Sequence, residues 1–340
     1  MNKTGLILDA GSLQDLKELA IRAEQSDFHS IWATELFRSS FQQLAAVSQV
    51  TSKIILGTSV SLAFVRSPLI TSLTALDLDE LSRGRLIIGI GSGAKRTNEK
   101  FHGVVHGKPV QHIKESLELI RSITTASHKT PDIKYSGEYY DIDMRGYRRP
   151  FKPVRDKIPI YLAGIGPGMC LTAGEYADGY IGHVVCTPEY LNKIVIPSVI
   201  SGLEKSGRSK EYFNITSIIT CAVSDDIKSA KRAAKATIAF YALVKTYQRP
   251  FRLHGFLPQT KRIRESYFKK DLEGMIKNVS DEMVDTFAVV GDREYCLDKI
   301  NEYREFIDLP VLSAPHYFID FDEVSYYQNN ILEVFGKSHT

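Results

Sequence analysis

Apolar and polar positions follow two alternating patterns from the first residues of the chain onward. Residues 5–10 are mostly apolar and predict a buried strand, and after Ser12 the residues Leu13, Leu16 and Leu19 recur at helical spacing. The pattern of strand and then helix repeats along the chain, with strands predicted near residues 5, 30, 54, 86, 158, 180, 215 and 310. Near-continuous apolar strands separated by helices predict a parallel sheet covered by helices.

Eight strands of this kind close a barrel better than they extend an open sheet. We therefore expect an α/β fold, a (β/α)₈ TIM barrel, and the 340 residues fit a single domain over residues 1–340. Two stretches exceed a minimal barrel: residues 92–110 after the fourth strand and residues 245–285 after the seventh. Extra segments that follow a barrel strand usually cover the active site, so both insertions are expected to contribute to its lid.

Composition narrows the expected partners and compartment. A formal net charge of +3 gives no reason to expect a nucleic acid or a membrane surface as a partner. Cys170, Cys186, Cys221 and Cys296 are far apart and form no CxxC pair, which argues against disulfides and against a metal site. No signal-peptide pattern is present and no apolar run reaches the roughly 18 residues of a membrane span, so we expect a cytoplasmic protein.

Two glycine-containing turns follow predicted strands, on the side where a barrel enzyme binds its substrate. The first, Gly91-Ser92-Gly93, belongs to a GxGxG sequence after the fourth strand, whereas a dinucleotide-binding fold carries GxGxxG after its first strand. The second, Gly-Ile-Gly-Pro-Gly at residues 164–168, lies between a strand and a helix predicted over residues 169–176. Backbone N–H groups at such a helix N-terminus can hold a phosphate, so residues 164–168 are called the phosphate turn below.

The phosphate turn and its surroundings also resemble a known family. Residues 160–167 and 173–179 resemble the phosphate-binding stretch of luciferase-like oxidoreductases, and the Gly-Pro form of the turn is similar to the branch that uses the deazaflavin coenzyme F420. Further similarity to that branch lies at residues 56–60, 66–68, 81–93, 238–241, 254–255 and 287–291. The resemblance spans nearly the whole chain and implies a flavin-type cofactor.

The resemblance implies particular cofactor contacts. The peptide bond between Ser59 and Val60 falls where these enzymes carry a non-proline cis bond that backs the deazaflavin ring. The glutamyl tail of F420 would benefit from cations, and Lys95 and Arg96 directly follow the turn at Ser92 and Gly93. The expected cofactor-binding residues are Glu35, Ser59, Val60, Ser61, Ser92, Gly93, Thr97, Gly164, Ile165, Gly166, Gly168 and Met169.

Glu35 and His183 are the candidate catalytic residues. In the resemblance, Glu35 matches an acidic cofactor-contacting position after the second strand, and His183 matches a polar substrate-pocket position after the sixth. Histidine is the side chain most easily poised for proton transfer near neutral pH. Sugar-phosphate dehydrogenases of the family carry a histidine where this chain has Leu36 and a glutamate where it has Ala94, so their route of proton transfer cannot be carried over.

The function predicted from these features is that of an F420-dependent oxidoreductase, which transfers a hydride between the deazaflavin and a small organic substrate. A homodimer is expected. One alternative is an FMN-dependent luciferase-like monooxygenase supplied with reduced flavin by a partner reductase. The other is a non-catalytic protein that binds a flavin or F420. This alternative stays open because Leu36 and Ala94 replace the acid-base residues of the sugar-phosphate dehydrogenases. The substrate, the reaction direction and the proton donor are not given by the sequence.

Overall fold

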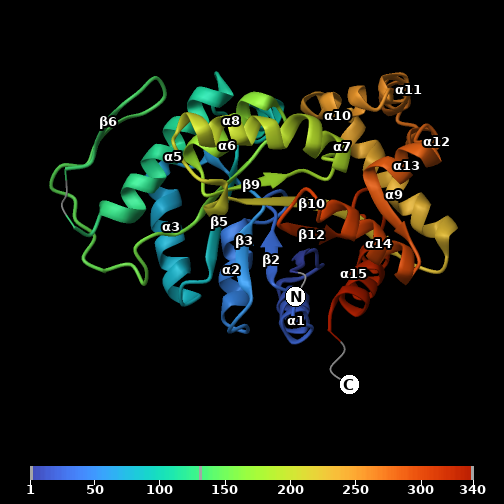
Figure 1. Cartoon of the computed structure of the whole chain (residues 1–340), viewed down its shortest axis with the longest axis horizontal. Helices are drawn as coiled ribbons and strands as arrows, with labels where there is room; N and C mark the ends of the chain where they lie inside the picture. The colour runs from blue at the N-terminus through green and yellow to red at the C-terminus, as the bar shows by residue number, and fades with distance from the viewer. Residues whose placement is uncertain (1–2, 130–131, 338–340) are drawn as a thin grey trace.

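Parallel strands form a closed barrel surrounded by helices (Figure 1) in the computed structural model, which describes residues 3–129 and 132–337. Within these residues the wall consists of eight strands: β1 (Gly5–Ile7), β2 (Ser30–Ala33), β3 (Ile55–Thr58), β5 (Leu86–Gly91), β8 (Ile160–Ala163), β9 (Gly179–Gly182), β10 (Asn214–Val223) and β12 (Leu309–Ser313). β9 pairs with β10, β10 with β12 and β12 with β1, so the ladder of hydrogen bonds closes. The predicted (β/α)₈ barrel and the places of its eight strands are confirmed.

Helices on the outside follow the strands in turn. They are α1 (Leu13–Gln25), α2 (Ser40–Ser48), α3 (Pro68–Leu81), α5 (Pro109–Ala126), α6 (Pro167–Tyr176), α8 (Ile196–Lys205), α9 (Ile227–Leu243), α14 (Arg293–Tyr303) and α15 (Phe321–Phe335). Local signals in the sequence determine several of their starts. The Ser12 hydroxyl accepts a hydrogen bond from the N–H of Asp15 at 3.1 Å, and Ser67 caps α3, which begins at Pro68.

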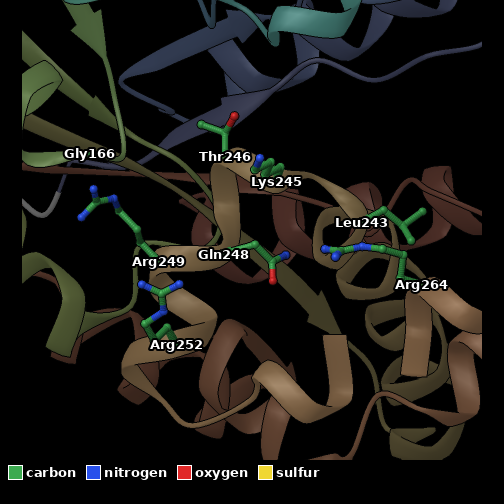
Figure 2. A pocket seen from close by; sticks show the side chains of 8 residues that line it. All are labelled: Gly166, Leu243, Lys245, Thr246, Gln248, Arg249, Arg252 and Arg264. Carbon is green, nitrogen blue, oxygen red and sulfur yellow. The ribbon is translucent and has the colours of Figure 1, made fainter. Parts of the chain in front are cut away.

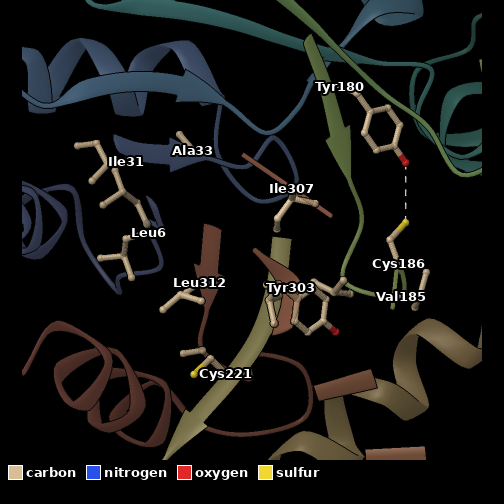
Figure 3. Packing of buried hydrophobic residues seen from close by; sticks show 14 of the residues in the cluster. Leu6, Ile31, Ala33, Tyr180, Val185, Cys186, Cys221, Tyr303, Ile307 and Leu312 are labelled. Atoms are coloured by element: carbon tan, nitrogen blue, oxygen red, sulfur yellow. Dashed lines mark hydrogen bonds between the residues drawn. The ribbon is translucent and has the colours of Figure 1, made fainter. Parts of the chain in front are cut away.

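Successive residues of each strand face opposite sides of the barrel wall. Leu6, Ile31 and Leu312 are in register on three adjacent strands and point outward into the helix-covered core (Figure 3). On the inner side, Trp32 is fully buried and its ring occupies the space where Gly57 has no side chain. The ring of Tyr161 lies against Gly179 in the same way, so aromatic rings opposite glycines fill the barrel interior.

The insertions differ in detail from the prediction. Residues 92–110 contain the short helix α4 (Lys95–Phe101), and residues 245–285 contain η4 (Lys245–Tyr247), α10 (Gln248–Leu253), α11 (Leu257–Phe268), α12 (Leu272–Lys277) and the start of α13 (Asp281–Phe287). The second insertion follows α9 rather than the strand itself, and α10–α13 gather beside that helix (Figure 1).

Several shorter elements were not predicted. A hairpin of β6 (Lys134–Ser136) and β7 (Asp141–Asp143) projects from the barrel between α5 and β8 (Figure 1). β11 (Ala288–Gly291) pairs with the last residues of β10, beyond the closed part of the wall. The remaining short elements are β4 (Ser61–Leu62), η1 (Ala63–Val65), α7 (Pro188–Tyr190), η2 (Leu191–Val195) and η3 (Lys210–Tyr212).

In the ranges 3–129 and 132–337, no helix combines the length and the apolar character needed to cross a bilayer.

Candidate active site

The carboxyl ends of the barrel strands meet at one face, called the mouth here. Because parallel strands all end on the same side, the predicted residues that follow β2, β3, β5, β8 and β9 are gathered at this face. Glu35, Ser59, Ser92, Gly164 and His183 each come within two residues of the end of their strand. Thr97 and Met169 lie farther along, on α4 and α6.

A bulge between β3 and β4 projects into the mouth. The peptide bond between Ser59 and Val60 is cis, as predicted. The N–H of Ser59 donates to the carbonyl of Ala33 at 2.7 Å, and the Thr58 hydroxyl donates to the carbonyl of Gly89 at 2.6 Å. Neighbouring strands on both sides therefore hold the bulge in place, while the Ser59 hydroxyl is buried without a hydrogen-bond partner among the described residues.

Glu35 joins β2 to this bulge. One carboxylate oxygen accepts from the guanidinium of Arg66 at 2.6 Å, and the other accepts from the N–H of Leu62 at 2.8 Å and the Ser61 hydroxyl at 3.3 Å. Both oxygens are thus engaged within the protein. The geometry favours a role for Glu35 in fixing the backbone around the cofactor site, whereas its predicted catalytic role stays a prediction.

The turn at Ser92 and Gly93 is held by a buried asparagine that sequence reasoning did not select. Asn98 donates from its side-chain amide to the carbonyl of Ser92 at 2.7 Å and lies 3.0 Å from Nδ1 of His106. Gly93 has φ of +66°, a left-handed conformation that favours glycine, and an added Cβ would approach the Asn98 amide oxygen to 2.8 Å. Substitution at Gly93 would therefore disturb the turn.

Two buried tyrosines orient the phosphate turn. The hydroxyl of Tyr180 donates to the carbonyl of Gly164 at 2.5 Å, and that of Tyr190 donates to the carbonyl of Ile165 at 2.9 Å. In a trans peptide the following N–H points opposite to the carbonyl, so the N–H groups of Ile165 and Gly166 point away from these tyrosines. Gly166 is the N-cap of α6, and a Cβ built on it meets no atom within 4 Å. Open space therefore lies in front of a helix N-terminus.

A polar and aromatic cluster forms another part of the mouth. The ring of His183 lies edge-on to Tyr241, with centroids 4.8 Å apart, and 4.2 Å from the ring of Tyr247. His316 follows β12; its Nδ1 is 3.8 Å from Oδ2 of Asp9, and its Nε2 is 3.5 Å from the Tyr241 hydroxyl. Asp9 Oδ2 and His183 Nδ1 are buried, and neither has a hydrogen-bond partner among the described residues.

Burial shifts the protonation of this cluster toward neutral forms. Burial raises the pKa of Asp9, and the nearby His316 opposes part of that rise. Burial also lowers the pKa of His183 to about 3, with a further contribution from His316, and it raises the pKa of Tyr247 to about 12. His183 is therefore uncharged at neutral pH. A neutral imidazole can donate one hydrogen bond and accept another, but it is a poor proton donor.

Tyr241, Tyr247 and His316 were not selected from the sequence. Asp9 was recognised as a position at the end of a predicted strand but was not chosen as a site residue. His316 stands only three residues after β12. Tyr241 and Tyr247 carry no such local signal, because their contact with His183 depends on how α9 and η4 fold back over the mouth. Among the described residues, no group of three or more His, Cys, Asp or Glu side chains could hold a metal ion.

Comparisons with known proteins place this site in context. The model of the luciferase-like monooxygenase family matches residues 2–308. A 5,10-methylenetetrahydromethanopterin reductase of Archaeoglobus fulgidus is 29% identical over 287 residues, covering 82% of this chain and 83% of that protein. The structure of a coenzyme F420-dependent tetrahydromethanopterin reductase from Methanopyrus kandleri matches with a TM-score of 0.81 and 25% identity over 98% of this chain and 97% of that one. An F420-dependent secondary alcohol dehydrogenase shares the fold, with a TM-score of 0.75 and 20% identity over 98% of each chain.

Proposed function

This chain belongs to the luciferase-like monooxygenase family, and from that premise we propose that it is an F420-dependent oxidoreductase acting on a small organic substrate. The observation that carries the proposal is the match, over nearly the full length of both chains, to an F420-dependent reductase. Bound deazaflavin would accept or supply a hydride at a ring carbon. The polypeptide must then bind the cofactor, orient the substrate, exclude water and manage the accompanying proton.

The residues at the mouth fit a cofactor with a polar ring and a phosphate. Ser59 Oγ, Asp9 Oδ2 and His183 Nδ1 are buried polar atoms without partners among the described residues, and such atoms are costly unless a ligand or water satisfies them. The N–H groups of Ile165 and Gly166 would hold the phosphate at the start of α6. The bulge at Ser59 and Val60, fixed through Glu35, would support one face of the ring.

We propose that Asp9, next to His316, supplies the proton that accompanies hydride transfer. Because burial raises the pKa of Asp9, its carboxyl retains a proton to higher pH than an exposed aspartate does. The imidazole of His316 lies between Asp9 and the Tyr241 hydroxyl, with its Nδ1 3.0 Å from the carbonyl of Ala314 and 3.8 Å from Asp9 Oδ2, and would orient the Asp9 carboxyl. This pair would provide the proton transfer for which Leu36 and Ala94 have no suitable side chains.

The test measures oxidation of reduced F420 with a panel of small carbonyl, imine and alkene compounds. We expect turnover by the wild-type protein and at least a hundredfold slower turnover by Asp9→Asn, in the range typical of a lost general acid. F420 affinity should fall far less than turnover, and a Leu36→Ala variant is the control. If Asp9→Asn keeps full activity and its pH profile, the proton comes from another group.

The family's description as monooxygenases keeps an FMN-dependent reaction as the second candidate. The same protein is therefore assayed with reduced FMN and oxygen. Oxygen consumption that depends on substrate, together with no oxidation of reduced F420, would replace the proposed function by flavin-dependent oxygenation.

A further inference from the structure

A cavity of about 780 Å³ opens beside the phosphate turn, between Gly166 and the second insertion (Figure 2). Its volume lies within the range of about 300–1,000 Å³ that small-molecule sites occupy. The lining residues are Gly166, Leu243, Lys245, Thr246, Gln248, Arg249, Arg252 and Arg264. Four of these eight residues carry a cationic side chain, and the lining contains no carboxylate.

These four cations lack internal counter-charges. Among the described residues, Lys245, Arg249, Arg252 and Arg264 form no ion pair and no side-chain hydrogen bond. The sequence accounts for this, because residues 243–264 contain six lysines or arginines and no aspartate or glutamate. Like charges held together repel one another, so a cavity lined by one sign of charge attracts ions of the other sign.

The neighbouring helices show that this shortage is local. On α9, Lys235 lies 2.6 Å from Asp281 of α13, and Arg232 lies 2.9 Å from Glu273 of α12. Cations of α9 that face α12 and α13 are thus paired with acids, whereas the described cations that line the cavity are not. Figure 2 shows Arg249 and Arg252 on the side of Gly166, with Arg264 reaching in from α11.

The cavity is continuous with the phosphate turn. Gly166 belongs to both, and the open space in front of it is the space that a Cβ would enter. The partial positive charge at the N-terminus of α6 therefore adds to the four side-chain cations. A ligand whose phosphate lies at the turn could extend directly among Lys245, Arg249 and Arg252.

We infer that this cavity binds a multiply anionic group, either a short chain of carboxylates or a further phosphate. Arginine forks match both groups because they donate two parallel hydrogen bonds to a pair of oxygens. The inference rests on the proposed function in placing a phosphate at the turn. The anionic group has two sources, the glutamyl tail of the deazaflavin or an anionic part of the substrate, and the experiment separates them.

The structure also makes this cavity a better site for the tail than the pair predicted from the sequence. Lys95 lies 3.7 Å from Glu99, one turn farther along α4, so its charge is already partly balanced. Neither Lys95 nor Arg96 lines the cavity. The double variant Lys95→Ala/Arg96→Ala therefore tests the competing hypothesis that these two residues bind the tail.

The test variant is Arg249→Ala/Arg252→Ala, and its matched control is Lys261→Ala/Arg262→Ala, which removes two exposed cations of α11 that do not line the cavity. Within residues 3–129 and 132–337, neither Arg249 nor Arg252 has a partner carboxylate, so truncation leaves no described carboxylate unpaired. Unfolding curves of each variant verify the fold. The ligands are F420, its form with the phosphate but no glutamates, and tripolyphosphate as a simple polyanion, each titrated by calorimetry.

We expect Arg249→Ala/Arg252→Ala to weaken tripolyphosphate binding at least about tenfold, with the loss shrinking as salt rises, while the control variant binds as the wild type does. If the tail fills the cavity, F420 affinity falls equally, the tail-less form is unaffected, and bound F420 excludes tripolyphosphate. If the substrate fills it, tripolyphosphate still binds to the F420 complex.

Equal tripolyphosphate and F420 affinity in the wild type and in Arg249→Ala/Arg252→Ala would overturn the inference, as would a loss seen only in Lys95→Ala/Arg96→Ala. Failure of the proposed function looks different. In that case F420 does not bind at all, but tripolyphosphate binding to the cavity still depends on Arg249 and Arg252.

Discussion

The two ends of the barrel are built from the same strands and differ in how their polar groups are satisfied. At the amino end, the carboxylate of Asp178 before β9 accepts from Lys157 at 2.5 Å, from Arg121 at 2.7 Å and from the N–H of Ile160 at 2.9 Å. These contacts hold the pKa of Asp178 low against the opposing effect of its burial. At the mouth, Oδ2 of Asp9 is also buried, but it has no hydrogen-bond partner among the described residues.

The difference teaches which residues stabilise the fold and which are kept available for a ligand. Burying a polar group without a partner costs free energy, so a protein tolerates it where binding later satisfies the group. At the amino end, the paired carboxylate of Asp178 contributes stability. The mouth contains Asp9 and the cations of the cavity, whose polar atoms are not fully satisfied within the described residues. These groups reduce stability but remain available to bind a ligand.

The largest effect is expected from a mutation that removes packing in the barrel interior. Trp32→Ala should lower the free energy of unfolding by about 3–5 kcal/mol, because it leaves a cavity against Gly57 that the rigid strands cannot close. Urea denaturation measures this. A loss below 1 kcal/mol would show that the interior does not depend on this ring.

Two glycines compare the packed interior of the barrel with its open mouth. Gly57→Ala should cost about 1–3 kcal/mol of stability, since the new methyl overlaps the Trp32 ring. Gly166→Leu should leave stability within about 0.5 kcal/mol, since its side chain enters open space. The same change should weaken F420 binding at least about tenfold by blocking charge-assisted contacts to the phosphate. Unchanged F420 affinity in folded Gly166→Leu would mean that the phosphate binds elsewhere.

The last effect appears only below neutral pH and is a dependence of stability on pH at the mouth. Burial lowers the pKa of His183 to about 3, below its ordinary value near 6.5. The neutral ring therefore contributes stability that is fully present above pH 6.5 and is lost as the pH falls toward 3. His183→Phe removes this titration, so the stability difference between variant and wild type should change with pH in that window. A constant difference from pH 7 to pH 4 would show that the His183 ring is solvated.

The sequence predicted the barrel well because local patterns carry it. Apolar runs and helical spacing located the eight strands, and the glycine turns after β5 and β8 located two sides of the mouth. The hairpin of β6 and β7 was missed, because its strands have only three residues each and no buried side chain. Strands this short, without buried positions, produce no distinct pattern of apolar and polar residues.

The chemistry of the mouth was harder to predict because it depends on long-range contacts. Asp9 and His316 stand at opposite ends of the chain, and their proximity comes from the pairing of β1 with β12. Arg249 and Arg252 look like ordinary surface cations in sequence. Their significance lies in the missing counter-charges and in the nearness of Gly166, which only the folded insertion reveals.

The measurement that tests the proposed function most directly compares the affinities of F420 and FMN for the wild-type protein at low salt. Both have a tricyclic ring and a phosphate, so the phosphate turn alone should not separate them, whereas unpaired cations at the mouth should favour the ligand with the anionic tail. We expect F420 to bind at least about tenfold more tightly, with the preference shrinking as salt screens the charges over roughly 8–10 Å. Tighter binding of FMN, with substrate-dependent oxygen consumption by the reduced complex, would contradict the proposal.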